Sequence, residues 1–201
     1  MAIENVGAVI TAAGQSTRMG QNKIMLRTGS RSVIQQIVFT LQKADVSPIV
    51  IVTGYQADLL RDHMAGWPVE FVHNPRYADS DMFSSAKAGF AGIQGRCARL
   101  FFTPADIPMF AVDTVRALLR ESADIVQPSY NGKKGHPILL RETLLAQFLK
   151  DSGDGGLREA IRRSGCNVKV ISVEDCAILL DIDTPEDYHC LLRDHVKGAL
   201  Y

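Results

Sequence analysis

The chain has 201 residues and a formal net charge of zero, and 46% of its residues are hydrophobic. The balanced charge argues against a nucleic-acid-binding surface. No apolar run approaches the roughly 20 residues that a membrane helix needs, and residues 1–5 lack the order of a signal peptide. We therefore expect a cytoplasmic protein that folds as one domain over residues 1–201, with neither nucleic acid nor a membrane as a partner.

Strand-like and helix-like patterns alternate along the first part of the chain. The continuous, β-branched run at residues 48–53 indicates a parallel strand covered on both faces. Further strands are expected at residues 6–11, 69–73, 99–103 and 124–127. Apolar residues at helical spacing indicate helices, at residues 32–44, 57–64, 82–93 and 112–121. Ser32 is the expected N-cap of the first helix.

The last third of the chain is less regular. We expect a polar turn at residues 131–135 and a strand at residues 136–140. Two helices are expected at residues 141–150 and 157–163, and two short strands at residues 168–173 and 177–181. Thr184 and Pro185 are typical of a helix start, as N-cap and first helical residue. Asp187 is expected to interact with the dipole of that first turn. The alternation predicts an α/β fold with a mostly parallel, twisted sheet flanked by helices.

A polar segment bracketed by glycines follows the first expected strand. Residues 11–23 read TAAGQSTRMGQNK. Arg18 lies between Gly14 and Gly20, and Lys23 follows three residues after Gly20. Glycine lets backbone N–H groups approach an anion closely, and a nearby cation completes such a site. The spacing matches neither the P-loop nor the dinucleotide fingerprint. We interpret the segment as a phosphate-binding loop at the carboxyl edge of the sheet.

Asp106 follows the expected strand at residues 99–103, so its carboxylate is expected at the same edge. Mg²⁺ that accompanies nucleotide phosphates takes one or two carboxylates and keeps some water. Asp106 is therefore a candidate Mg²⁺ ligand. The alternative is a turn residue that caps the helix after Pro108.

Several segments resemble the molybdenum cofactor nucleotidyltransferases. Residues 11–23 match the signature of that family at Ala12, Ala13, Gly14, Ser16, Arg18, Met19, Gly20 and Lys23. The segments around Asp106 and at residues 84–89, 135–137 and 181–187 resemble further motifs of the family. The resemblance implies a Rossmann-like nucleotidyltransferase fold of the glycosyltransferase-A type.

The resemblance also implies roles for individual residues. Arg18, Lys23 and Asp106 would be catalytic, and Asp106 and Asp183 would hold Mg²⁺. The nucleotide would be bound by Thr11, Ala12, Ala13, Gly14, Ser16, Arg18, Lys23, Ser84 and Ser85. His136 and Lys134 would contact the phosphate of the acceptor. Ordinary helix capping remains the alternative for Asp183, and a solvated turn remains the alternative for Lys134 and His136.

The implied reaction transfers CMP from CTP to the phosphate of molybdopterin or the molybdenum cofactor and releases pyrophosphate. Ala13 replaces the first glycine of the L-A-G-G loop that is usual in the guanylyl branch, and its methyl group favours a pyrimidine. GTP as the donor, a sugar phosphate as the acceptor, and a non-catalytic nucleotide-binding regulator remain alternatives. The resemblance also leaves a recipient molybdoenzyme open as a partner.

Overall fold

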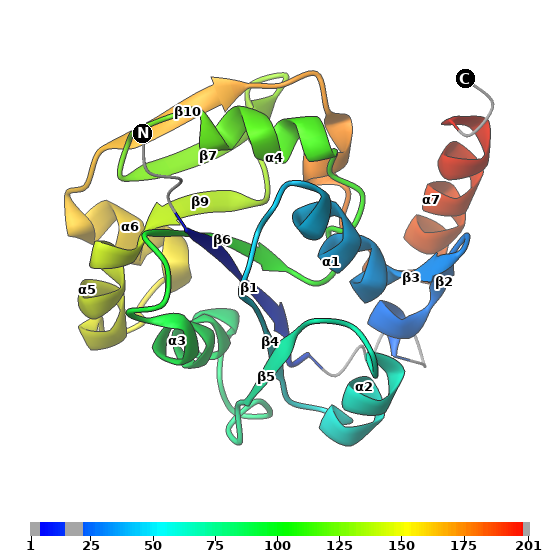
Figure 1. Ribbon diagram of the computed structural model, residues 1–201, viewed down its shortest axis with the longest axis horizontal. Coiled ribbons are helices and arrows are strands. Elements are labelled where there is room, and N and C mark those ends of the chain that lie inside the picture. The colour runs from blue at the N-terminus through cyan, green and yellow to red at the C-terminus, as the bar shows by residue number, and fades with distance from the viewer. Residues whose placement is uncertain (1–4, 15–21, 199–201) are drawn as a thin grey trace.

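The structure is a computed structural model that describes residues 5–14 and 22–198. Within these residues one mixed sheet has the order β10-β7-β9-β6-β1-β4-β5, and β8 pairs with β7 (Figure 1). The strands are β1 Val6–Ala12, β4 Ile49–Thr53, β5 Glu70–His73, β6 Arg99–Pro104, β7 Ile125–Tyr130, β8 Lys133–Lys134, β9 Ile138–Arg141 and β10 Val168–Ser172. Strands β5, β4, β1 and β6 are parallel, and β9 runs antiparallel between β6 and β7. The predicted mostly parallel α/β sheet is confirmed.

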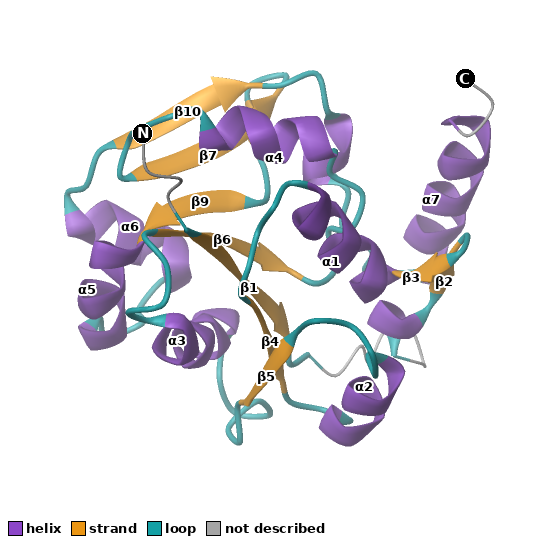
Figure 2. Cartoon of the chain, in the orientation of Figure 1, coloured by secondary structure: helices purple, strands orange, loops and turns teal. Residues whose placement is uncertain are grey.

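Helices cover both faces of this sheet (Figure 2). They are α1 Val33–Lys43, α2 Ala57–His63, α3 Met82–Ile93, α4 Val112–Leu119, α5 Leu145–Lys150, α6 Gly156–Ser164 and α7 Pro185–Gly198. One buried cluster joins the sheet to α1, α2 and α4, and a second joins it to α3, α5 and α6. Neighbouring residues of β1 belong to different clusters, Val9 to the second and Ile10 to the first. This double burial explains why β1 is apolar at consecutive positions.

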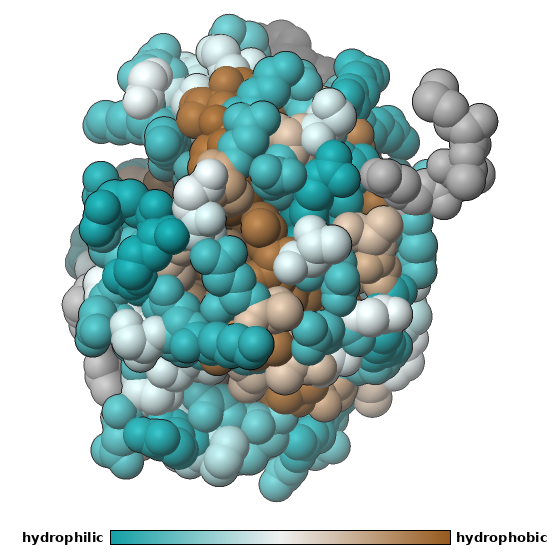
Figure 3. Space-filling view, turned by 90° about the vertical axis from the view of Figure 1, so that its left-hand side faces the viewer, coloured by the Kyte–Doolittle hydropathy of each residue, from teal (hydrophilic) through white to brown (hydrophobic). Residues whose placement is uncertain are grey.

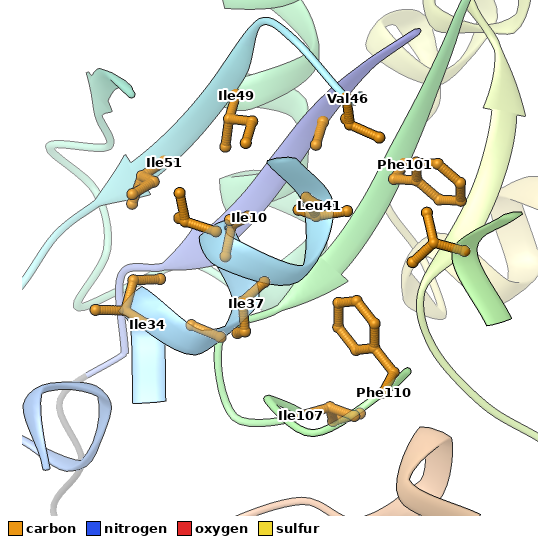
Figure 4. Close-up of a cluster of buried hydrophobic side chains, with 14 of the residues drawn as sticks. Ile10, Ile34, Ile37, Leu41, Val46, Ile49, Ile51, Phe101, Ile107 and Phe110 are labelled. Carbon is orange, nitrogen blue, oxygen red and sulfur yellow. The ribbon is translucent and has the colours of Figure 1, made fainter. Parts of the chain in front are cut away.

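Helix α1 packs an apolar face against the sheet (Figure 4). Ile34, Ile37 and Leu41 recur at helical spacing and are fully buried. They pack against Ile10 of β1 and Ile51 of β4 in the same cluster. Full burial of each such side chain contributes about 1.5–3 kcal/mol. This contact fixes β1 and β4, whose carboxyl ends border the site described below.

Two predicted helix starts are confirmed. Ser32 Oγ accepts from the backbone N–H of Gln35, and the Gln35 side chain accepts from the Ser32 N–H, which completes a capping box. At α7, Thr184 Oγ1 accepts from the Asp187 N–H at 3.2 Å. Asp187 Oδ2 in turn accepts from the Thr184 N–H at 2.8 Å. Asp187 therefore caps the helix start.

The structure differs from the sequence prediction in three short segments. The strand expected at residues 177–181 is a 3-10 helix, η4 Cys176–Leu179, because the Asp175 carboxylate accepts from the Ala177 N–H and caps it. The turn expected at residues 131–135 includes β8, since Asn131 and Gly132 adopt the left-handed φ values of 49° and 76° that a two-residue hairpin turn requires. A hairpin of β2 Arg27–Thr28 and β3 Arg31–Ser32 was not predicted.

The face shown in Figure 3 is mostly hydrophilic, with an apolar strip near its middle. Scattered apolar surface of this kind is ordinary for a globular protein. Among the helices in the described part of the chain, none has the length and apolar character needed to cross a bilayer.

The packing of α3 on the sheet predicts the effect of one substitution. A Cβ at Gly89 would lie 2.4 Å from Val9 Cγ1 and 2.7 Å from Val52 Cγ2. We expect Gly89→Ala to lower the free energy of unfolding by about 1–3 kcal/mol, because α3 must move away from the sheet. Ala91→Leu on the exposed side of the same helix is the control, with a change within about 0.5 kcal/mol. Urea unfolding monitored by circular dichroism measures both values, and an unchanged midpoint for Gly89→Ala would contradict this packing.

Candidate functional site

The candidate site is a cleft at the carboxyl ends of β1 and β6. The ladder between these strands ends at Thr11 and Pro104, and the Ala105 N–H then donates to the Thr11 carbonyl at 3.0 Å. The cleft has a volume of about 330 Å³. It is lined by Thr11, Ala12, Ala13, Gly14, Lys23, Ile24, Tyr77, Ser80, Asp81, Met82, Ser85, Pro104, Ala105, Asp106 and Asp183. The sheet thus places a ligand-sized space where parallel α/β folds bind their ligands.

Lys23 joins two distant acidic residues in this cleft. Its Nζ lies 3.0 Å from Asp106 Oδ2 and 2.8 Å from Asp183 Oδ1. The Ile182 N–H also donates to the Asp106 carbonyl at 2.9 Å, so the backbones of the two acidic segments are in contact. The structure therefore brings together three residues that the sequence analysis placed in one site.

The two carboxylates determine the protonation of Lys23. Burial alone would lower the pKa of its ammonium group. The charge of Asp106 and the hydrogen bonds with Asp183 and Asp106 outweigh burial, so the pKa of Lys23 is raised. Lys23 is therefore a cation at neutral pH, and its charge lies between both acidic groups.

Asp187 explains how Asp183 presents its carboxylate to Lys23. Asp187 Oδ2 accepts from the backbone N–H groups of Asp183 and Thr184, at 3.1 Å and 2.8 Å. Hydrogen bonds from Thr184 and Asp183 lower the pKa of Asp187, which keeps this anchor ionised. Thr184 and Asp187 cap the start of α7 through these reciprocal hydrogen bonds.

Asp106 and Asp183 are the described residues best placed to hold a metal ion. No group of three or more His, Cys, Asp or Glu side chains with metal-binding geometry is found in residues 5–14 and 22–198. Two carboxylate oxygens nevertheless converge on one cation, the Lys23 ammonium group. A pair of carboxylates fits Mg²⁺ that takes its other ligands from substrate phosphates and water.

The structure separates the two predicted serines. Ser85 is buried, lines the cleft and accepts from Asn74 Nδ2 at 3.0 Å. Ser84 is exposed, and its hydroxyl and its backbone N–H both donate to Asp81 Oδ1, at 2.7 Å and 2.8 Å. Ser84 therefore takes part in capping α3 and is not among the residues that line the cleft, so its contact with the nucleotide stays a prediction.

The first loop is described up to Gly14. Thr11, Ala12, Ala13 and Gly14 all line the cleft as predicted. Thr11 Oγ1 is buried and has no hydrogen-bond partner among the residues that the structure describes. Ser16 and Arg18, both predicted to bind the nucleotide, lie outside the described residues.

A second cavity of about 1070 Å³ adjoins the first and shares Asp81 and Met82 with it. The predicted acceptor residues Lys134 and His136 line this second cavity. Burial lowers the pKa of His136, an effect that the Phe102 backbone and the charge of Asp106 only partly offset. His136 is therefore neutral at pH 7, and its Nδ1 has no hydrogen-bond partner in the described part of the chain.

Lys133, which precedes Lys134 in the same basic turn, also lines the second cavity. Two further basic residues there were not predicted, Arg158 and Arg162. Arg158 and Arg162 lie four residues apart on α6, a spacing that places them on one helix face. This spacing was readable in the sequence, but only the packing of α6 shows that the face borders a cavity.

Comparison with known proteins identifies similar sequences. Residues 8–168 match the family model described as the MobA-like NTP transferase domain. The molybdenum cofactor cytidylyltransferase of Escherichia coli is 34% identical over 187 residues, which cover 91% of this chain and 93% of that protein. A probable molybdenum cofactor guanylyltransferase of Carboxydothermus hydrogenoformans is 26% identical, with 95% and 97% coverage.

Solved structures share the fold. A nucleotidyl transferase from Methanothermobacter has a TM-score of 0.83 at 20% identity, covering 96% of this chain and 99% of that one. Rv0371c of Mycobacterium tuberculosis, solved in complex with manganese, has a TM-score of 0.78 at 23% identity, and the match covers 95% of this chain and 99% of that one. The predicted nucleotidyltransferase fold is confirmed.

The ion pairs of Lys23 predict a stability effect. We expect Lys23→Met to lower the free energy of unfolding at pH 7 by about 1–2 kcal/mol, because two neighbouring carboxylates lose their counter-ion. The loss is smaller than for a fully buried pair, since the Asp183 side chain is 40% exposed. Lys169→Met, which breaks the more exposed pair with Glu121, is the control and should change stability by less than about 0.5 kcal/mol. Urea unfolding at pH 7 tests this, and equal effects of both variants would contradict it.

Proposed function

The chain belongs to the family of MobA-like NTP transferase domains, and we propose that it transfers CMP from CTP to the phosphate of molybdopterin or its molybdenum-loaded form. An oxygen of the acceptor phosphate forms a bond to the α-phosphorus of CTP, and the bond from that phosphorus to the bridging oxygen breaks. Pyrophosphate leaves with the electron pair of that bond. The observation that carries this proposal is the convergence of Lys23, Asp106 and Asp183 beside the Gly14 loop.

The residues of the cleft account for how such a transfer is assisted. The loop at Gly14 and the cations Arg18 and Lys23 would hold the β- and γ-phosphates. Mg²⁺ held by Asp106 and Asp183 would neutralise the charge of the phosphate oxygens. Preorganised positive charge and positioning supply most of the catalysis in phosphoryl chemistry. No general base is required, because the attacking phosphate is already an anion.

The choice of CTP is supported by two observations. The Escherichia coli relative is named a cytidylyltransferase and matches nearly the whole chain. Ala13 lines the cleft and is 5% exposed, so its methyl group reduces the space available for a base. The guanylyltransferase relative keeps GTP as the second candidate donor.

The second cavity is the proposed acceptor site. Its lining has more basic than acidic side chains, and this net positive charge suits an anionic acceptor. The basic residues are Lys133, Lys134, Arg158 and Arg162, the acidic ones are Asp81 and Glu159, and Arg162 is paired with Glu159 at 2.7 Å. His136 would donate to a phosphate oxygen through Nδ1, in the tautomer that carries the single ring proton on that nitrogen. Because the cavity shares Asp81 and Met82 with the cleft, an acceptor bound there would lie next to the donor. We place this reaction in the cytoplasm, in one domain spanning residues 1–201, with transfer of the product to a recipient molybdoenzyme.

Pyrophosphate release tests the proposed function. Purified protein with Mg²⁺, molybdopterin and CTP should release pyrophosphate much faster than with GTP, and none should appear without the acceptor. Lys23→Ala and Asp106→Ala should each reduce the rate by about two or more orders of magnitude, because charge stabilisation is lost. Lys169→Ala is the matched control, because Lys169 lines neither cavity and its ammonium group pairs with Glu121. Faster release with GTP would establish the guanylyl alternative, and nucleotide binding without release would establish the regulator.

The position of Lys23 also predicts how metal binding depends on the nucleotide. Lys23 occupies the point where both carboxylates converge, so a metal ion must compete with its ammonium group. We expect Mn²⁺ to bind at least about tenfold more tightly with CTP present, because the triphosphate attracts Lys23 and adds ligands. Lys23→Met should strengthen Mn²⁺ binding without nucleotide, whereas Lys169→Met should not. Electron paramagnetic resonance of free Mn²⁺ measures this, and identical wild-type affinities with and without CTP would refute the competition.

A further inference from the structure

The segment between β5 and α3 forms one wall of the nucleotide cleft. Tyr77, Ser80 and Asp81 of this segment line the cleft, although it contains no regular helix or strand, and Met82 at the start of α3 continues the wall. Asn74 begins the segment directly after β5, and its N–H donates to the Thr53 carbonyl at 2.8 Å. This bond fixes the start of the wall to the sheet.

The side chain of Asn74 is buried at 6% exposure and is fully hydrogen-bonded. Its Nδ2 donates to Ser80 Oγ at 3.1 Å and to Ser85 Oγ at 3.0 Å. Its Oδ1 accepts from the Arg76 N–H at 3.0 Å. One amide thus connects the wall to the first turn of α3.

The direction of these bonds determines what the two serines offer a ligand. A serine hydroxyl has one proton to donate and two positions that accept. Asn74 Nδ2 can only donate, so each serine oxygen accepts from it and keeps its own proton. Within the described residues, neither proton has an acceptor among the hydrogen bonds formed by Ser80 and Ser85. Both serines line the cleft, so both protons are available to a bound ligand.

We infer that Asn74 is a positioning residue for nucleotide recognition, which turns Ser80 and Ser85 into a pair of donors facing the base. The inference rests on the proposed function, because the cleft must be the nucleotide site. Cytosine presents two adjacent acceptors, O2 and N3, that match two neighbouring donors. The corresponding edge of guanine places an N–H donor beside its O6 acceptor, so one hydroxyl proton would meet another proton.

A purely structural Asn74 would stabilise the wall without directing the hydroxyl protons, and Asn74→Asp separates these two roles. The carboxylate of this variant keeps an oxygen that accepts from the Arg76 N–H but replaces the donor nitrogen by an acceptor oxygen. The hydroxyl protons of Ser80 and Ser85 then turn toward that carboxylate and away from the cleft. The backbone of the wall keeps its anchor.

Calorimetric titration with CTP and Mg²⁺ tests the inference. Asn74→Asp should weaken CTP binding by about tenfold or more, as expected for two lost hydrogen bonds, and should raise KM with kcat changed less than about threefold. Ser80→Ala with Ser85→Ala should weaken binding comparably, and adding Asn74→Asp to that double variant should weaken it no further. Asn167→Asp, an exposed site outside both cavities, controls for the added charge.

Each outcome distinguishes the inference from the proposed function. Equal CTP affinities of the wild type and Asn74→Asp would overturn the inference but not the proposed function. The same holds if Asn74→Asp further reduces CTP affinity in protein that already carries Ser80→Ala and Ser85→Ala. Absence of CTP binding by the wild type would overturn both. If Asn74→Asp fails to fold, Asn74→Ala removes the donors without adding an acceptor. Asn74→Ala should reduce CTP affinity less than Asn74→Asp does, and it should cause no further reduction in protein that already carries Ser80→Ala and Ser85→Ala. A further reduction in that protein would overturn the inference.

Discussion

The site depends on one ammonium group placed between two carboxylates. Lys23, Asp106 and Asp183 come from parts of the chain up to 160 residues apart, and each would be costly in a half-buried cleft without the others. Their convergence requires the carboxyl end of β6 and the segment before α7 to lie beside the chain that follows β1. The backbone bond from Ile182 to Asp106 joins two of these segments, and Asp187 fixes the backbone of Asp183 within its own segment. The same three charges that stabilise the ligand-free cleft are those that a triphosphate and a metal ion would rearrange.

The rest of the architecture serves this convergence. The apolar strands β1, β4 and β6 bring their carboxyl ends to one edge, and the helices on both faces leave that edge open. Helix α3 lies close to the sheet because Gly89 has no side chain, which places Ser85 at the wall of the cleft. The second cavity continues from the shared residues Asp81 and Met82 toward α6. A nucleotidyltransferase of this family needs two substrates to meet, and the two cavities meet along this shared wall.

Sequence alone predicted the sheet, the family and most cleft residues, because strand ends and a dense motif leave local signals. It could not predict that Lys23 lies on both carboxylates, since such pairing depends on the tertiary arrangement of distant segments. The short strand at residues 177–181 was wrong because a single capping side chain, Asp175, decided the local structure. The hairpin at Asn131 had a readable Asn-Gly signal that was interpreted only as a turn. Asn74 gave no signal beyond a loop before proline, because its importance comes from what its amide contacts.

A crystal structure with CTP and Mn²⁺, in which anomalous scattering locates the metal, tests the role of Lys23, Asp106 and Asp183 most directly. We predict one anomalous peak bound by Asp106 and Asp183, with Lys23 Nζ moved from the two carboxylates to a phosphate of CTP. A metal bound elsewhere, while Lys23 still bridges Asp106 and Asp183, would show that these ion pairs are a structural feature only.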